Sequence, residues 1–68
     1  NGKVIRPDRL VFGDNGITII DYKTGEPLQS HEEQILNYSR HIKEMGYAVN
    51  SCVLVYINED SIVLNEFV

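Results

Sequence analysis

The stretch RLVFGDNGITIIDY, residues 9–22, decides the fold that we expect for this chain. Arg9 to Phe12 and Ile17 to Tyr22 are rich in β-branched and aromatic residues, which is typical of strands. Between them lies Gly13-Asp14-Asn15-Gly16, and these residue types tolerate the positive φ that a tight hairpin turn requires. We therefore predict two antiparallel strands joined by a tight turn; if that turn holds two residues, Asp14 and Asn15, Phe12 faces Ile17.

The remainder of the chain predicts one helix and a second pair of strands. Ser30 and Glu33 fit a capping box at the start of a helix, and Gly46 fits its end. An apolar stripe with helical spacing lies between these signals: Ile35, Tyr38, Ile42 and Met45. Val49 to Ile57 and Ile62 to Val68 are β-prone and flank a turn-like segment at 58–61.

The predicted order of elements is therefore β-β-α-β-β. A lone helix should pack on one face of a mixed sheet, which makes the expected fold class α+β or α/β. The connection from the second strand through the helix to the third is long enough for a crossover between parallel strands. Residues 1–68 are expected to form one domain, since a chain of this length cannot hold two cores.

Composition excludes several classes of function. No apolar run approaches the roughly 20 residues that a membrane span needs, so no membrane partner is expected. The net charge of −4, taken alone, argues against a non-specific nucleic-acid binder. The excess acidity lies in residues 44–68, which hold acids and no base, while acids and bases balance over residues 1–43. The lone cysteine, Cys52, excludes an internal disulfide, a zinc knuckle and a four-cysteine iron–sulfur cluster within this stretch. We expect Cys52 in the core and the protein in a reducing, cytoplasmic compartment.

Three charges extend an otherwise apolar face of the predicted hairpin. Side chains alternate across a strand, so Asp21 and Lys23 share a face, and a two-residue turn sets Asp8 opposite Asp21. Opposed like charges are destabilising, and a divalent cation would compensate both aspartates. Oxygen ligands suit Mg²⁺ or Mn²⁺, and Lys23 would then lie near a bound water or phosphate. The alternative is a salt-bridged strand end that is exposed to solvent.

The motifs resemble the PD-(D/E)xK nuclease signature. Pro7-Asp8 followed by Asp21-Tyr22-Lys23 matches its short pattern, and residues 19–25, IIDYKTG, are similar to the DYKTG string of the RecB-like branch. Gln34 and Tyr38 match the QxxxY motif of that branch, in the same order. Within the branch, the chain most resembles the nuclease domains at the C-terminus of UvrD-like helicases, such as RecB and AddA.

The resemblance implies a restriction-endonuclease-like fold and hydrolysis of a DNA phosphodiester, with Mg²⁺ or Mn²⁺ as cofactor. Asp8 and Asp21 would bind the metal, together with the backbone carbonyl of Tyr22. Lys23 would be the catalytic lysine, and Gln34 and Tyr38 would contact DNA or position the site. Gln34 and Tyr38 share one helix face because they are four residues apart. The alternative is that Tyr38 belongs to the core and Gln34 to the surface.

The family also has a helix that precedes this region and supplies a further acid, often with a histidine ligand. Only five residues precede Arg6, so we expect that helix upstream of this chain, which would make the chain part of a nuclease domain. An exonuclease-type activity, a role in DNA repair or recombination, an attached helicase and a partner subunit are implied by the resemblance alone. Whether this stretch cleaves DNA by itself stays open.

Three alternatives remain at this point. The chain could belong to a nuclease, to a non-catalytic module of the same fold that binds DNA or assembles with a subunit, or to an unrelated interaction module. The last would be favoured if Asp8 and Lys23 lay on opposite faces of the sheet.

We also expect self-association, because a sheet without its upstream helix would expose apolar surface and Ile62 to Val68 is expected at an edge. His31 and His41 are expected to be surface residues.

Overall fold

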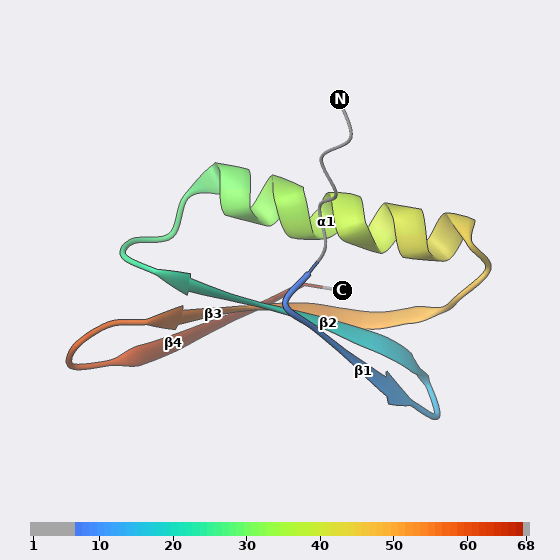
Figure 1. The fold of residues 1–68 in the computed structure, drawn as a ribbon, viewed down its shortest axis with the longest axis horizontal. Helices are drawn as coiled ribbons and strands as arrows, with labels where there is room; N and C mark the ends of the chain where they lie inside the picture. Colours follow the sequence, from blue (N-terminus) through green and yellow to red (C-terminus); the bar gives the residue numbers. More distant parts are fainter. Residues whose placement is uncertain (1–6, 68) are drawn as a thin grey trace.

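The computed structural model describes residues 7–67, which form one helix against one face of a four-stranded sheet (Figure 1). The elements follow the predicted order: β1 (Arg9–Gly13), β2 (Gly16–Thr24), α1 (Gln29–Glu44), β3 (Val49–Ile57) and β4 (Ile62–Phe67). Sheet order equals chain order, so β2 and β3 are central and β1 and β4 are the edges. Of the two expected classes, α+β and α/β, the structure has the first, and the expected mixed sheet is confirmed.

The hairpin has the register that a two-residue turn implies. Phe12 pairs with Ile17, and Gly13 pairs with Gly16, so two residues form the turn. The next pair, β2 and β3, runs parallel, as expected for strands joined by a crossover through α1. A shift in this ladder between Ile17 and Thr18 marks an irregularity near the start of β2. The β3–β4 pair is antiparallel.

The core lies between α1 and the sheet. Its buried apolar side chains come from β2, β3 and one stripe of the helix: Ile17, Ile19, Ile35, Tyr38, Ile42, Cys52, Leu54 and Tyr56. Cys52 is buried, as predicted. Met45 was expected to continue the helical stripe, and this is wrong, because it is the C-cap residue of α1 and 68% exposed. Gly46 follows with φ 98°, the left-handed conformation that commonly ends a helix.

The predicted capping box is also wrong. Leu28 is the N-cap residue of α1 and makes no side-chain cap hydrogen bond, so Ser30 lies in the first turn and Glu33 lies beyond it, inside the helix. The backbone N–H of His31 donates to the carbonyl of Leu28. Since most helical stability in proteins comes from packing an apolar face, the burial of Ile35 and Tyr38 explains how α1 can form without that cap. Among residues 7–67, no helix is long and apolar enough to cross a membrane.

Candidate metal centre

The two strands of the hairpin bring the predicted carboxylates together. The backbone N–H of Asp8 donates to Oδ1 of Asp21 at 2.9 Å, and the backbone N–H of Tyr22 donates to Oδ2 of Asp8 at 2.8 Å. Asp8 precedes β1, whose ladder with β2 ends at the pair of Arg9 and Ile20. The side chains of Asp8 and Asp21 therefore link the two strands of the hairpin beyond the last backbone pair.

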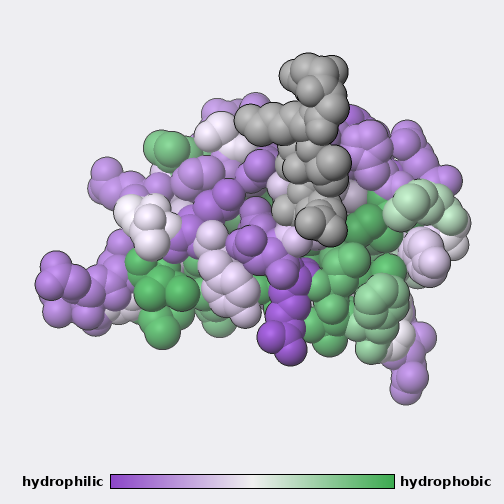
Figure 2. Space-filling view, in the orientation of Figure 1, coloured by the Kyte–Doolittle hydropathy of each residue, from purple (hydrophilic) through white to green (hydrophobic). Residues whose placement is uncertain are grey.

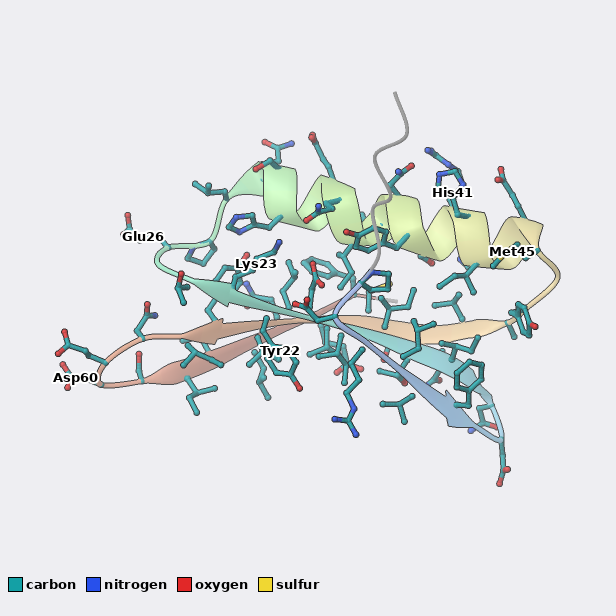
Figure 3. The ribbon with its side chains drawn as sticks, viewed as in Figure 1. Tyr22, Lys23, Glu26, His41, Met45 and Asp60 are labelled. Carbon is teal, nitrogen blue, oxygen red and sulfur yellow. The ribbon has the colours of Figure 1, made fainter. Side chains whose placement is uncertain are left out.

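Lys23 joins Asp21 to the helix. Its Nζ lies 3.3 Å from Oδ2 of Asp21 and donates to Oε1 of Gln34 at 2.9 Å. Figure 3 shows Lys23 between the sheet and α1, whereas Tyr22 projects from the opposite side of β2. The structure thus places Lys23 and Asp21 on the helix side, within one hydrogen-bonded network that includes Asp8 and Gln34.

The burial of Asp21 is unusual for a charged group, whereas Asp8 is exposed and Lys23 is partly buried. Asp21 is 2% exposed, although it sits on the same face of β2 as the core residues Ile17 and Ile19. A buried carboxylate is costly unless it is paired and hydrogen-bonded. Each oxygen of Asp21 has a partner, but a carboxylate has about four lone-pair positions, so a further ligand can be accommodated. The network also has a net negative charge, because two aspartates are paired with only one lysine.

The backbone of Tyr22 lies beside the same carboxylates. The N–H and the carbonyl of one residue in an extended strand point to the same side of that strand. Since the N–H of Tyr22 points to Asp8, its carbonyl lies on this edge of β2 as well. Two carboxylates and one carbonyl form an oxygen donor set of the kind that Mg²⁺ and Mn²⁺ prefer. Within residues 7–67, no cluster of three or more His, Cys, Asp and Glu side chains could hold a metal.

Tyr38 lies on the buried stripe of α1, which faces the sheet. It is 6% exposed and belongs to the core cluster. Burial raises the pKa of its hydroxyl above 10.0, and the negative charges of Asp21 and Asp8 raise it further.

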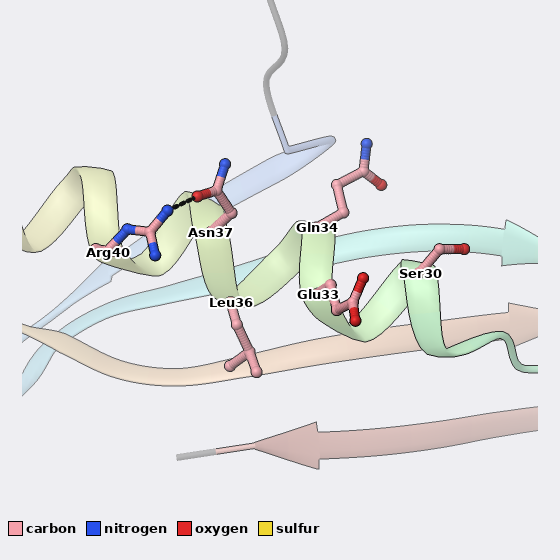
Figure 4. Close-up of a pocket in the computed structure, with 6 residues that line it drawn as sticks. All are labelled: Ser30, Glu33, Gln34, Leu36, Asn37 and Arg40. Carbon is pink, nitrogen blue, oxygen red and sulfur yellow. Dashed lines mark hydrogen bonds between the residues drawn. The ribbon is translucent and has the colours of Figure 1, made fainter.

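Gln34 connects the carboxylates with the outer surface of α1. Together with five neighbours it lines a hollow along the helix: Ser30, Glu33, Leu36, Asn37 and Arg40 (Figure 4). In this view Gln34 and Asn37 point to the same side of α1, and Arg40 donates to Asn37. A surface of mostly neutral polar side chains, with one arginine and one glutamate, therefore begins at the carboxylate site.

The sequence did not predict the pairing of His31 with Tyr56. Nδ1 of His31 lies 3.1 Å from the hydroxyl of Tyr56, a residue that is 1% exposed. The expectation of a surface position is thus wrong for His31, which is half-buried, and right for His41, which is exposed. Tyr56 is the register partner of Lys23 across β2 and β3, so this pair lies beside the network. A histidine three residues before Gln34, on the same helix face, is the signal that could have indicated it.

These findings define the chain as a small α+β domain with a mixed four-stranded sheet, one helix, and a buried aspartate, Asp21, paired with Lys23 on the helix side of the sheet. A comparison with models of known protein families found no match. A search among curated proteins likewise found none that matches this chain.

Proposed function

We propose that this chain carries the metal-binding and catalytic residues of a metal-dependent DNA nuclease domain with a restriction-endonuclease-like fold. The observation that carries the proposal is the convergence of Asp8, Asp21 and Lys23 at one end of the hairpin, with Gln34 bonded to the lysine. The order of elements and the parallel β2–β3 pair are compatible with the fold that the motifs suggest.

In the proposed site, Asp8, Asp21 and the carbonyl of Tyr22 hold Mg²⁺ or Mn²⁺. When bound, the cation supplies Lewis-acid chemistry for phosphodiester hydrolysis and offsets the surplus negative charge of the aspartates. In that reaction a water oxygen bonds to phosphorus, the bond from phosphorus to the leaving oxygen breaks, and a proton ends on the leaving oxygen. The chain's own residues orient the phosphate and stabilise its developing charge.

Lys23 is suited to that role. An ammonium group has three hydrogen-bond donors, and two of them are directed to Asp21 and Gln34. The third is left for a non-bridging phosphate oxygen, where it would stabilise charge that develops in the transition state. Gln34 fixes the position of the ammonium, since its amide oxygen lies 2.9 Å from Nζ.

DNA is the proposed substrate, and its backbone would run from the carboxylates along the hollow that Gln34, Asn37 and Arg40 line on α1. Side chains of these types make most phosphate contacts in protein–DNA complexes. An attached helicase, a partner subunit and a role in DNA repair or recombination follow from the resemblance of the motifs and belong to the proposal on that basis.

A second function is favoured by a different observation. Both carboxylates already accept backbone N–H groups, and Lys23 already bridges β2 and α1. The same residues could therefore serve as a structural clamp in a non-catalytic module that binds DNA or a subunit. This alternative predicts no specific cation binding.

Calorimetric titration with Mn²⁺ separates the two functions. The 68-residue chain is compared with Asp21→Asn, and Asp14→Asn in the exposed hairpin turn is the matched control. The proposal expects saturable binding that Asp21→Asn abolishes and Asp14→Asn preserves. If all three proteins bind Mn²⁺ equally weakly, the metal site is refuted and the clamp is favoured. Where binding is found, loss of Mg²⁺-dependent DNA cleavage in Lys23→Met tests the catalytic role.

A further inference from the structure

The face of the sheet opposite α1 carries most of the exposed apolar side chains of the strands. Because side chains alternate along a strand, the residues between the buried ones of β2 and β3 point away from the helix. Opposed residues of an antiparallel pair share a face, which extends this surface to both edges. We name it the open face, and its apolar members are Val11, Ile20, Tyr22, Val53, Val55, Ile57, Ile62 and Leu64.

No element covers the open face among the residues that the structure describes (Figure 1). Figure 2 shows hydrophobic colour gathered on the strands and hydrophilic colour over the helix. The exposed fractions are large for aliphatic side chains, reaching 67% at Ile62 and 64% at Leu64. Contiguous apolar surfaces of this kind mark interaction sites in soluble proteins.

One row of the open face has opposite charges at its two ends. Arg9 pairs with Ile20, Ile20 pairs with Val53, and Val53 pairs with Glu66. The four residues therefore lie side by side across the sheet, with a cation on the β1 edge, an anion on the β4 edge and two apolar residues between them. Both end residues are exposed.

This row is complementary to itself when reversed. A two-fold axis that runs parallel to the strands, between two sheets that face each other, brings β1 of one copy over β4 of the other. It leaves the position along the strands unchanged, so Arg9 of each copy meets Glu66 of the other, and Ile20 meets Val53. Such reciprocal contacts are the mark of an isologous dimer. We propose that the open face binds a second copy of this chain in this arrangement.

The dimensions of the face suit a weak dimer. Four strands about 4.8 Å apart and strands of five to nine residues at about 3.3 Å per residue give a face of roughly 20 by 17–30 Å. That projection, with the corrugation of its side chains, approaches the roughly 800 Å² per partner of a standard interface. Packed sheets lie about 10 Å apart with strands within about 30°, a gap that arginine and glutamate can bridge together.

The proposal does not depend on the proposed function. Asp21 and Lys23 lie on the helix side of β2, so each copy in the dimer would keep its carboxylate site free. The charged pairs at the rim would fix the orientation of the two copies more than they would raise affinity.

Charge reversal tests the two-fold geometry directly. Arg9→Glu and Glu66→Arg each juxtapose like charges twice in a homodimer, whereas an equimolar mixture of the two variants restores both opposite-charge pairs. We expect the wild type to dimerise with a dissociation constant on the order of micromolar, each single variant to weaken dimerisation by roughly ten-fold or more, and the mixture to recover wild-type affinity. Sedimentation velocity over a concentration series measures each constant.

Two control variants change the net charge by the same amount outside the open face. Arg40→Glu on α1 and Glu59→Arg in the β3–β4 turn should leave the dimer unchanged, and circular dichroism checks that every variant folds. A wild-type chain that stays monomeric at millimolar concentration would overturn the proposal. So would a dimer that ignores both reversals, which would indicate pairing through the edge strands, or single variants that weaken the dimer without recovery in the mixture.

Discussion

Nζ of Lys23 lies 3.3 Å from Oδ2 of Asp21, and the two residues are separated by one position on the same face of β2. The side chain of Asp21 is 3% exposed and that of Lys23 is 22% exposed. The ammonium is thus the nearest compensating charge for a carboxylate that the core has almost enclosed. This relationship determines how the site should respond when either charge is removed.

Lys23→Met should destabilise the fold by about 1–3 kcal/mol, because it leaves a buried carboxylate without its cation. Asp21→Asn in the Lys23→Met background should recover part of that loss, since the neutral amide needs no counter-charge. Urea denaturation of the wild type, both single variants and the double variant gives the coupling free energy. Lys43→Met, at an exposed position of α1, is the matched control and should cost little.

Divalent cations extend this experiment. If Mn²⁺ binds Asp8 and Asp21, it should stabilise the folded Lys23→Met variant by mass action and raise its urea midpoint. Asp21→Asn should show no such rise. A midpoint that is indifferent to Mn²⁺ in Lys23→Met would contradict the metal site even if the coupling free energy is large, and would support the clamp.

Tyr56→Phe should destabilise the protein by about 1 kcal/mol, because it removes the hydroxyl that lies 3.1 Å from Nδ1 of His31 and keeps the buried ring. The pair ties the first turn of α1 to β3, so amide hydrogen exchange at this end of the helix should accelerate. His31→Ala should produce the same local effect. Tyr47→Phe, at a position that is 53% exposed, should leave both the stability and the exchange rates unchanged.

Most of the confirmed structural predictions rest on local sequence patterns. The Gly13-Asp14-Asn15-Gly16 turn fixed the hairpin register within a few residues, and the β-branched run from Val49 to Ile57 matches the bounds of β3. The common face of Asp21 and Lys23 followed from strand alternation alone. Periodicity of this kind needs no knowledge of distant contacts.

Contacts between residues that are far apart in the sequence could not be predicted from these local patterns. His31 meets Tyr56 only because the crossover lays the start of α1 over β3, and the residues are 25 positions apart. The start of the helix at Gln29 likewise depends on packing, which the capping signal of Ser30 and Glu33 did not reveal. The bond between Lys23 and Gln34 also joins two elements, and only the resemblance to a nuclease motif placed Gln34 near the site.

Alkaline pH should lower stability partly through Tyr38. Burial raises the pKa of its hydroxyl above 10.0 in the folded protein, with further increments from Asp21 and Asp8. The folded state then holds this proton more tightly than the unfolded chain, so the contribution is fully present below pH 10 and is lost as pH rises through the folded pKa. Burial also raises the pKa of Cys52 above 9.0, which adds a decline of the same sign that begins at lower pH.

Comparison of Tyr38→Phe with the wild type isolates the tyrosine, because the contribution of Cys52 is common to both. The free energy of unfolding of Tyr38→Phe should fall less steeply as the pH rises above about 10. Urea denaturation at a series of pH values measures the slope. A slope identical to that of the wild type would show that the Tyr38 hydroxyl titrates alike in the folded and unfolded states.

Gly16 should tolerate no side chain, since two independent constraints meet at its α-carbon. Its φ is 129°, and an added Cβ would lie 2.8 Å from the carbonyl oxygen of Ala48, a backbone atom that cannot rotate away. Ile17 donates its N–H to that same oxygen, so relief of the clash would disturb the start of the β2–β3 ladder. Gly16→Ala should therefore lower the free energy of unfolding by more than the roughly 1 kcal/mol expected of backbone strain alone.

Gly13→Ala, across the same turn, is the matched control, because its Cβ would lie at an ordinary 3.5 Å from the oxygen of Gly16. Equal urea midpoints for the two variants would contradict the close approach of the hairpin to Ala48.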